Sequence, residues 1–465
     1  MKELYMDIPW WGLLPFVVML GTIAVAPLIP ATHHAWERNS VKLAVALLLG
    51  VPVAIWIWFG VDHHLVLHSL EEYAQFIALL FSLYVVSGGL FVAGDIQATP
   101  RNNTIILAIG GALASFIGTT GAAMLLIRPL LNINREREYK VHTVVFAILL
   151  VANCGGLLTP LGDPPLYIGL MRGVPFAWTF SMWAEWLFIG TLLLLTYYGQ
   201  ERLYYSKESE FAIAWEEASS PPLSLHGKLN IVWFAVIIGS VALLGDYTWL
   251  KIGVQLGAAA ASYFIGDRAI RVQDNEFTWH PIAEVAVLFV GIFLTMIPAL
   301  EFLRAHAGQL PLNEYTLFGF TGALSSMLDN APTYLTFFEM STQLTLPGEP
   351  LVAGVPQLYL TAVSLGAVTC GALTYIGNGP NFMVKSVAEE RGVKMPSFGG
   401  YIGWALRYLA PILVAMVLIF LSANPLLLIL GIGLAALIAG DAIRLAVAHP
   451  LPQLAKDEPD PLTVV

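Results

Sequence analysis

Long apolar stretches, separated by short polar segments, run along nearly the whole chain. Each stretch is close to the roughly 20 residues that a helix needs to cross about 30 Å of hydrocarbon. The stretches predict nine plain membrane helices at 10–28, 41–60, 73–94, 177–198, 229–245, 249–266, 281–300, 402–423 and 425–444. We therefore expect an all-α polytopic membrane protein.

Four further apolar regions are interrupted near their centres by Gly, Pro, Asn, Asp or Thr. They are 104–131, 141–171, 313–340 and 357–389. Lipid offers no hydrogen bonds, so irregular backbone at membrane depth must be buried in protein or line a wet cavity. We expect 104–131 and 313–340 to be re-entrant hairpins and 141–171 and 357–389 to be broken helices, which gives about 11 crossings plus 2 hairpins.

The two halves of the chain resemble each other at these interruptions. The segment 154–165 matches 370–381, and the hairpin tip 118–121 matches 328–331. Five crossings per half is an odd number, so the second repeat is expected to be inverted, which is typical of transporters with a site near the membrane midplane. The predicted units are inverted repeat 1 over 1–199, a cytoplasmic linker over 200–228, inverted repeat 2 over 229–424, and a final helix and cytoplasmic tail over 425–465.

Composition and charge narrow the function further. Charged residues make up 12% of the chain and apolar residues 57%, which excludes an ordinary soluble enzyme. The net charge of −10 comes without basic patches, so nucleic acid is not an expected partner. Basic residues crowd one side of the predicted topology, which places the N-terminus outside and the C-terminus in the cytoplasm of a cell (inner) membrane.

Proline and glycine mark the point at which each broken helix should be interrupted. A proline in a helix interior costs about 3 kcal/mol, so the helix is expected to end there and to free carbonyl and N–H groups that can bind an ion. A simple packing kink is the alternative. The predicted helix-break residues are Gly162, Pro164, Pro165, Gly377, Gly379 and Pro380.

Oxygen-bearing side chains gather at the same breaks and tips. An ionised aspartate at mid-bilayer costs on the order of 3 kcal/mol, which makes Asp163 and Asp329 candidates for binding Na⁺ or a proton. For Asp329 the alternative is a helix N-cap, and for Thr119 and Thr120 a hydroxyl bonded to its own helix. The predicted cation- and proton-binding residues are Asp163, Asp329, Asn330, Asn378, Asn381, Thr119, Thr120, Thr159 and Thr333.

The chemistry of this set favours a hard cation, since no Arg or Lys lies at a tip or break to hold an anion. A carboxylate shared by Na⁺ and H⁺ supports exchange, because protonation expels the metal. No cofactor is expected beyond the transported ions Na⁺ or Li⁺ and H⁺. Glu72 and Glu284, at matching positions of the two halves, are expected to be structural.

Three strings carry a resemblance to a known family. They are 328–334 (Leu-Asp-Asn-Ala-Pro-Thr-Tyr), 153–165 (Asn-Cys-Gly-Gly-Leu-Leu-Thr-Pro-Leu-Gly-Asp-Pro-Pro) and 377–381 (Gly-Asn-Gly-Pro-Asn). They resemble NhaD-type sodium/proton antiporters of the ion transporter superfamily, which also holds arsenite permeases and citrate carriers. The resemblance implies a central site between hairpins and broken helices, an elevator-like movement and a homodimer. The Gly-Thr-Thr-Gly tip at 118–121 departs from the Asn-containing tip of many relatives.

These observations predict secondary active transport that exchanges Na⁺ (or Li⁺) for protons at Asp163 and Asp329. Na⁺-coupled symport of citrate or another small carboxylate is the first alternative, and an ion channel is another. A remote alternative is an intramembrane aspartyl protease, because 161–163 (Leu-Gly-Asp) resembles part of its motif, although Pro160 replaces the first glycine of that motif. The chain is otherwise expected not to be an enzyme.

Overall fold

The computed structural model describes residues 8–26, 29–36, 38–93, 96–208, 224–244, 247–275, 277–306, 309–328 and 330–451. These residues are largely helical, which confirms the all-α fold. Two short antiparallel strand pairs are present among them: β1 (Phe91–Ala93) pairs with β2 (Ser224–His226), and β3 (Leu351–Val352) pairs with β4 (Val355–Pro356).

Six helical segments of the described residues are long and apolar enough to span a membrane, or up to seven if a bent pair counts as one span. They are Asn39–Gly60, His63–Ser87, Val141–Leu158, Phe176–Tyr205, His280–Phe302 and Pro425–Ala448. A polytopic membrane protein is therefore confirmed. The eleven crossings and the inverted repeat stay predictions.

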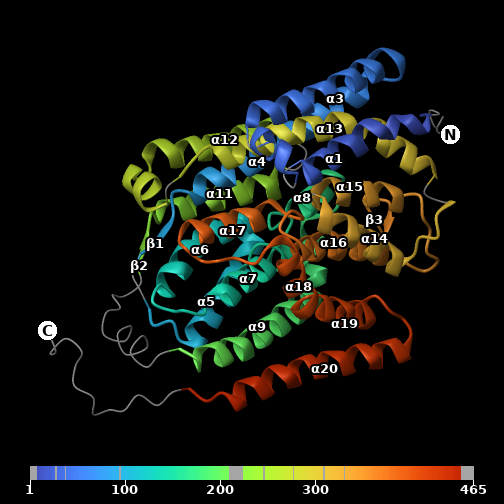
Figure 1. Ribbon diagram of the computed structural model, residues 1–465. Helices are drawn as coiled ribbons and strands as arrows, with labels where there is room; N and C mark the ends of the chain where they lie inside the picture. The colour runs from blue at the N-terminus through green and yellow to red at the C-terminus, as the bar shows by residue number, and fades with distance from the viewer. Residues whose placement is uncertain are drawn as a thin grey trace, which may run out of the picture.

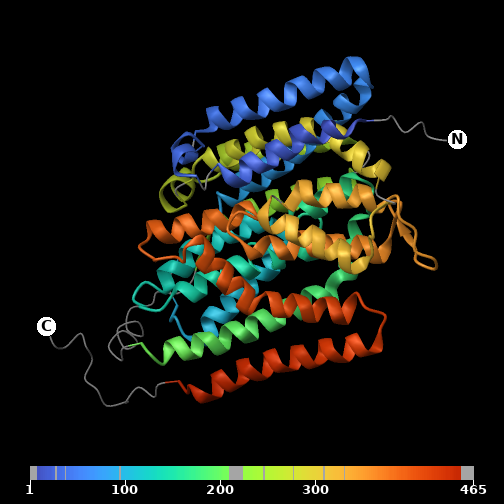
Figure 2. The same ribbon diagram turned by 45° about the vertical axis from the view of Figure 1, so that its right-hand side comes forward.

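The helices form three neighbouring groups (Figures 1 and 2). The first, here called the scaffold bundle, contains α1 (Leu14–Val25), α3 (Asn39–Gly60), α4 (His63–Ser87), α11 (Leu229–Leu243), α12 (Thr248–Ile265) and α13 (His280–His306). In Figure 1 it lies along the top, above the second group.

The second group, the core bundle, is built from the four interrupted regions. Its members are α5 (Pro100–Ile117), α6 (Thr119–Ile133), α7 (Val141–Leu150), α8 (Pro164–Met171), α14 (Glu314–Met327), α15 (Asn330–Ser341), α16 (Gln357–Cys370) and α17 (Gly379–Glu390). The third group covers the far side of the core bundle with α9 (Trp183–Tyr205), α18 (Phe398–Tyr408), α19 (Ala410–Phe420) and α20 (Pro425–Ala448).

Specific contacts fix α4 against α13 within the scaffold bundle. The rings of Phe76 and Phe289 stack with their centroids 4.7 Å apart. The Ser69 hydroxyl donates to the Phe293 carbonyl at 2.7 Å. Side-chain hydroxyls that reach backbone carbonyls of a neighbouring helix satisfy polar groups that lipid cannot.

Two of the predicted elements are wrong in detail. The stretch 402–423 is not one plain helix, because α18 and α19 meet at Leu409 with a bend of 40°. Pro411 explains the break, since its nitrogen has no hydrogen for the carbonyl of Arg407. The predicted helix 73–94 instead begins at His63 and ends at Ser87, and the Asp62 carboxylate caps its start by accepting from the His64 N–H at 2.8 Å.

Candidate ion-binding site at the helix breaks

The first helix break separates α7 from α8. A short 3-10 turn (Cys154–Leu158) follows α7, and α8 then begins at Pro164. A Cβ atom on Gly162 would lie 2.0 Å from the Gly156 carbonyl oxygen. The backbone segments around residues 156 and 162 can therefore lie this close together only because residue 162 is glycine. The Thr159 hydroxyl donates to the Ser115 carbonyl and accepts from the Leu161 N–H, which ties the break to α5.

The second helix break, between α16 and α17, repeats this local arrangement. A 3-10 turn (Gly371–Leu373) follows α16, and α17 begins at Gly379 with a proline in its first turn. A Cβ atom on Gly377 would lie 2.5 Å from the Gly371 carbonyl oxygen. The Thr374 hydroxyl donates to the Ser326 carbonyl at 2.5 Å and accepts from the Gly377 N–H at 3.1 Å. Both breaks are therefore held by a threonine bonded to a backbone carbonyl of a neighbouring helix, α5 or α14.

Two helix pairs, α5–α6 and α14–α15, each have a tip that approaches the first break. Gly118 joins α5 to α6 with a φ of +82°, a backbone conformation that favours glycine. The next N–H, that of Thr119, donates to the Gly162 carbonyl at 2.8 Å. At the other tip α14 ends at Met327 and α15 begins at Asn330. Asp329 lies outside the described residues.

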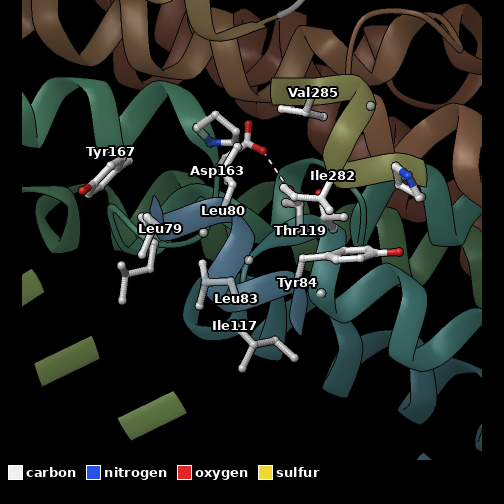
Figure 3. Close-up of a pocket in the computed structure, with 18 of the residues that line it drawn as sticks. Leu79, Leu80, Leu83, Tyr84, Ile117, Thr119, Asp163, Tyr167, Ile282 and Val285 are labelled. Atoms are coloured by element: carbon white, nitrogen blue, oxygen red, sulfur yellow. Dashed lines mark hydrogen bonds between the residues drawn. The ribbon is translucent and has the colours of Figure 1, made fainter. Parts of the chain in front are cut away.

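Asp163 is the centre at which these elements meet. Its carboxylate is 1% exposed, and Oδ1 accepts from the Thr119 hydroxyl at 2.8 Å and from the Asn378 amide at 3.2 Å. Its Oδ2 accepts from the Asn330 amide at 2.5 Å. Figure 3 shows the bond from Thr119 and the apolar side chains of α4 and α13 around it. One carboxylate thus joins both tips and the second break.

Asn153 is a site residue that the sequence analysis did not single out. Its amide donates to the Asn381 side-chain oxygen at 2.6 Å and to the Ile148 carbonyl at 2.8 Å. Its own Oδ1 accepts from Asn378 at 3.2 Å. Asn153 therefore links the two breaks and orients the amide that reaches Asp163. One sequence feature could have identified Asn153: it is an asparagine directly before the Cys-Gly pair of an interrupted apolar region.

The other predicted residues occupy different surroundings. The Asn381 amide donates to the Gly371 and Thr374 carbonyls, both at 2.9 Å, and its oxygen is taken by Asn153, so it braces the second break. Thr333 is buried on α15, and Thr120 borders the cavity beside Asp163. Asn330 Oδ1 is buried and accepts no hydrogen bond from the described residues, which leaves it available as a ligand.

Two cavities adjoin the site. A cavity of ≈ 80 Å³ borders Asp163, Thr119 and Thr120 on one side and α4 and α13 on the other. A larger cavity of ≈ 900 Å³, here called the vestibule, reaches Asn378 and Gly379 and also borders Arg128, Glu284 and Lys385. Gly379 and Met383 of α17 border both cavities. The vestibule therefore leads along the boundary between the scaffold and core bundles to the helix breaks.

The charged groups around the vestibule have local partners. Lys385 pairs with Glu389 at 2.8 Å, and Glu284 pairs with Lys42 of α3 at 2.5 Å. Arg128 donates to the Asn275 carbonyl. Arg128 and Lys385 border the vestibule and are not among the residues that line the smaller cavity beside Asp163.

Comparison with known proteins places the whole site inside one family model. The model, described as putative citrate transport, matches residues 5–421. The match includes both breaks, both tips and the helices that border the vestibule. No curated protein matches the chain.

Proposed function

The chain belongs to the putative citrate transport family, and we propose that it is a secondary active transporter in which the Asp163 carboxylate binds the coupling ion. The observation that supports this is the meeting of both tips and the second break at one buried carboxylate. A carboxylate at a discontinuity of membrane helices is well placed to respond to ion binding, because broken helices are the parts that such transporters use at their sites.

The favoured coupling chemistry is exchange of Na⁺ (or Li⁺) for protons, as in NhaD-type antiporters. Asp163 and the available oxygen of Asn330 are hard ligands of the kind that such cations prefer. A proton competes for the same carboxylate, so metal and proton would leave and enter in turn. Asp329 is proposed as a second carboxylate, by sequence alone.

A second candidate is cation-coupled symport of citrate or a related carboxylate. Two observations favour it: the family description and the vestibule of ≈ 900 Å³, a volume typical of small-molecule sites. Lys385 and Arg128 border this cavity and could attract an anion before it reaches the breaks. In this scheme Asp163 binds the driving cation rather than the exchanged one.

The same proposal includes an elevator-like movement of the core bundle against the scaffold bundle. The vestibule supports this idea because it lies at the boundary between the two bundles. We also propose a homodimer in a cell (inner) membrane, with the N-terminus outside and the C-terminus in the cytoplasm.

The test uses purified protein in proteoliposomes with an internal pH dye. Exchange predicts that NaCl added outside alkalinises the lumen, because Na⁺ enters as H⁺ leaves, without any carboxylate present. Symport predicts that labelled citrate accumulates only with a cation gradient. If the protein is folded, as shown by its thermal unfolding transition, and gives neither of these two responses, the proposed function is rejected.

A further inference from the structure

Three charged side chains meet where α4, α8 and α15 approach one another. Arg172, which directly follows α8, contacts Glu72 of α4 and Glu339 of α15, each at 3.2 Å. The exposed fraction of the side chain is 18% for Arg172, 5% for Glu72 and 3% for Glu339. The two carboxylates bind different guanidinium nitrogens, Nη2 and Nη1. Because the group is largely shielded from water, it is not one of the exposed surface pairs that contribute little.

This cluster crosses the boundary between the two bundles. Glu72 belongs to the scaffold bundle, whereas Arg172 and Glu339 belong to the core bundle. A rigid movement of the core bundle would carry Arg172 and Glu339 together and would separate both from Glu72. The Glu72–Arg172 contact must therefore break in such a movement, while the Arg172–Glu339 contact can persist.

The cluster and the vestibule lie toward opposite ends of the bundles. Tyr84 borders the vestibule and follows Glu72 by 12 residues on α4, which places it about 18 Å farther along the helix. On the core side, the residues between Asp163 and Arg172 form α8, which leads away from the break. The boundary between the bundles is thus closed by charged side chains at one end, here called the closed end, and opens into the vestibule at the other.

The vestibule end holds a different set of polar contacts. The Lys42–Glu284 pair joins α3 to α13, so it lies within the scaffold bundle and would not break when the core bundle moves. Arg128 of α6 donates to the Asn275 carbonyl. The Glu72–Arg172 pair crosses the boundary at the closed end, next to His68, whose Nε2 lies 3.3 Å from the Glu72 carboxylate.

We infer that the Glu72–Arg172 ion pair is a latch that holds the core bundle against the scaffold bundle in the vestibule-open state and opens once in each transport cycle. This inference rests on the proposed transport function. Arg172 acts as a positioning residue, since it contacts the two carboxylates at the end of α8 opposite to Asp163. Glu339 keeps the Arg172 guanidinium paired when the latch is open, because Glu339 moves together with Arg172 in the core bundle.

The test compares two isosteric substitutions on either side of the same guanidinium. Glu72→Gln removes the scaffold partner and leaves Arg172 paired with Glu339, so no buried charge is left alone. Glu339→Gln removes the core partner and leaves the contact across the boundary. The latch predicts that the first variant opens the closed end and that the second does not.

Spin labels on exposed positions report the movement without any transport measurement. One label pair at the closed end uses Leu67→Cys on α4 and Leu351→Cys on β3; a second pair at the vestibule end uses Val272→Cys and Arg391→Cys. The native cysteines are both buried, which limits background labelling. Distances are measured by pulsed electron spin resonance on full-length protein in lipid.

With Glu72→Gln we expect the closed-end pair to gain a longer distance and the vestibule pair to gain a shorter one, with the ratio of the two states changed on the order of tenfold. Glu339→Gln should keep both parental distributions. Unchanged distances in Glu72→Gln, or an equal change in Glu339→Gln, would overturn the latch. Failure of transport in the parent protein would overturn the proposed function instead, whatever the distances show.

Discussion

At the scale of single residues, Asp163 is defined by the kind of groups that bind it. A hydroxyl from Thr119 and amides from Asn330 and Asn378 orient the carboxylate without neutralising its charge. Neutral donors of this kind stabilise a carboxylate while leaving its attraction for a cation. The arrangement suits an ion that must bind and leave.

Asp163→Asn should abolish ion-coupled transport, because an amide keeps the shape but cannot bind Na⁺ by charge or exchange it for a proton. The measurement is the NaCl-driven pH change in proteoliposomes, with labelled citrate uptake in parallel. Asp441→Asn makes the same chemical change on α20, where the carboxylate is 58% exposed and pairs with Arg444. It should transport like the parent; coupled transport retained in Asp163→Asn would exclude the carboxylate as the coupling group.

Asn153→Ala should lower both stability and the apparent affinity for the coupling ion. It removes the hydrogen bonds to Asn381, Asn378 and the Ile148 carbonyl, and leaving buried partners unsatisfied costs about 1–3 kcal/mol. Thermal unfolding in detergent and the Na⁺ concentration for half-maximal rate measure the two effects. Asn132→Ala, at an exposed position on α6, is the matched control and should change neither value. Equal behaviour of the two variants would contradict the bridging role of Asn153.

At the scale of elements, the helix breaks depend on glycines that allow two backbone segments to touch. Gly162→Ala should prevent the first break from closing, since its Cβ would lie 2.0 Å from the Gly156 carbonyl oxygen. We expect poor expression of folded protein, measured by the monodisperse fraction on size-exclusion chromatography. Gly379→Ala, in the second break, meets nothing within 4 Å and should fold normally. A well-folded Gly162→Ala protein would show that the close backbone approach is not required.

The sequence predicts the elements around the site better than it predicts their contacts. Gly162, Pro164, Gly377 and Pro380 interrupt apolar regions, and a new helix begins beside them in each case, because these residues act through local backbone geometry. The bend at Leu409 was missed because Pro411 lies in an unbroken apolar stretch that reads as one span. Local rules give the position of a break but not which side chain from elsewhere will reach it.

Contacts between distant residues account for what the sequence could not supply. Asn153 bonds to residues 225 and 228 positions away, so its bridging role depends on how the two halves pack. The same holds for Glu72, expected to be structural by its position near a helix start, which pairs with Arg172 across the bundle boundary. Asp163 was predicted as a candidate because a carboxylate within an apolar region is costly wherever it packs.

At the scale of the whole molecule, the coupling ratio follows from how many carboxylates a proton and Na⁺ share. If one carboxylate is shared, the Na⁺ concentration for half-maximal rate should rise about tenfold for each pH unit below the pKa of the site, because each bound proton excludes one Na⁺. If Asp329 acts with Asp163 in binding the same Na⁺, the rise should approach a hundredfold per unit. Affinity is thus lost as pH falls, and saturating Na⁺ should restore the rate. The measurement is initial rate against NaCl at several pH values in proteoliposomes held at zero membrane potential. A half-maximal Na⁺ concentration that does not change with pH would mean that the proton and the cation bind at separate places, and coupling would then have to run through the movement of the core bundle alone.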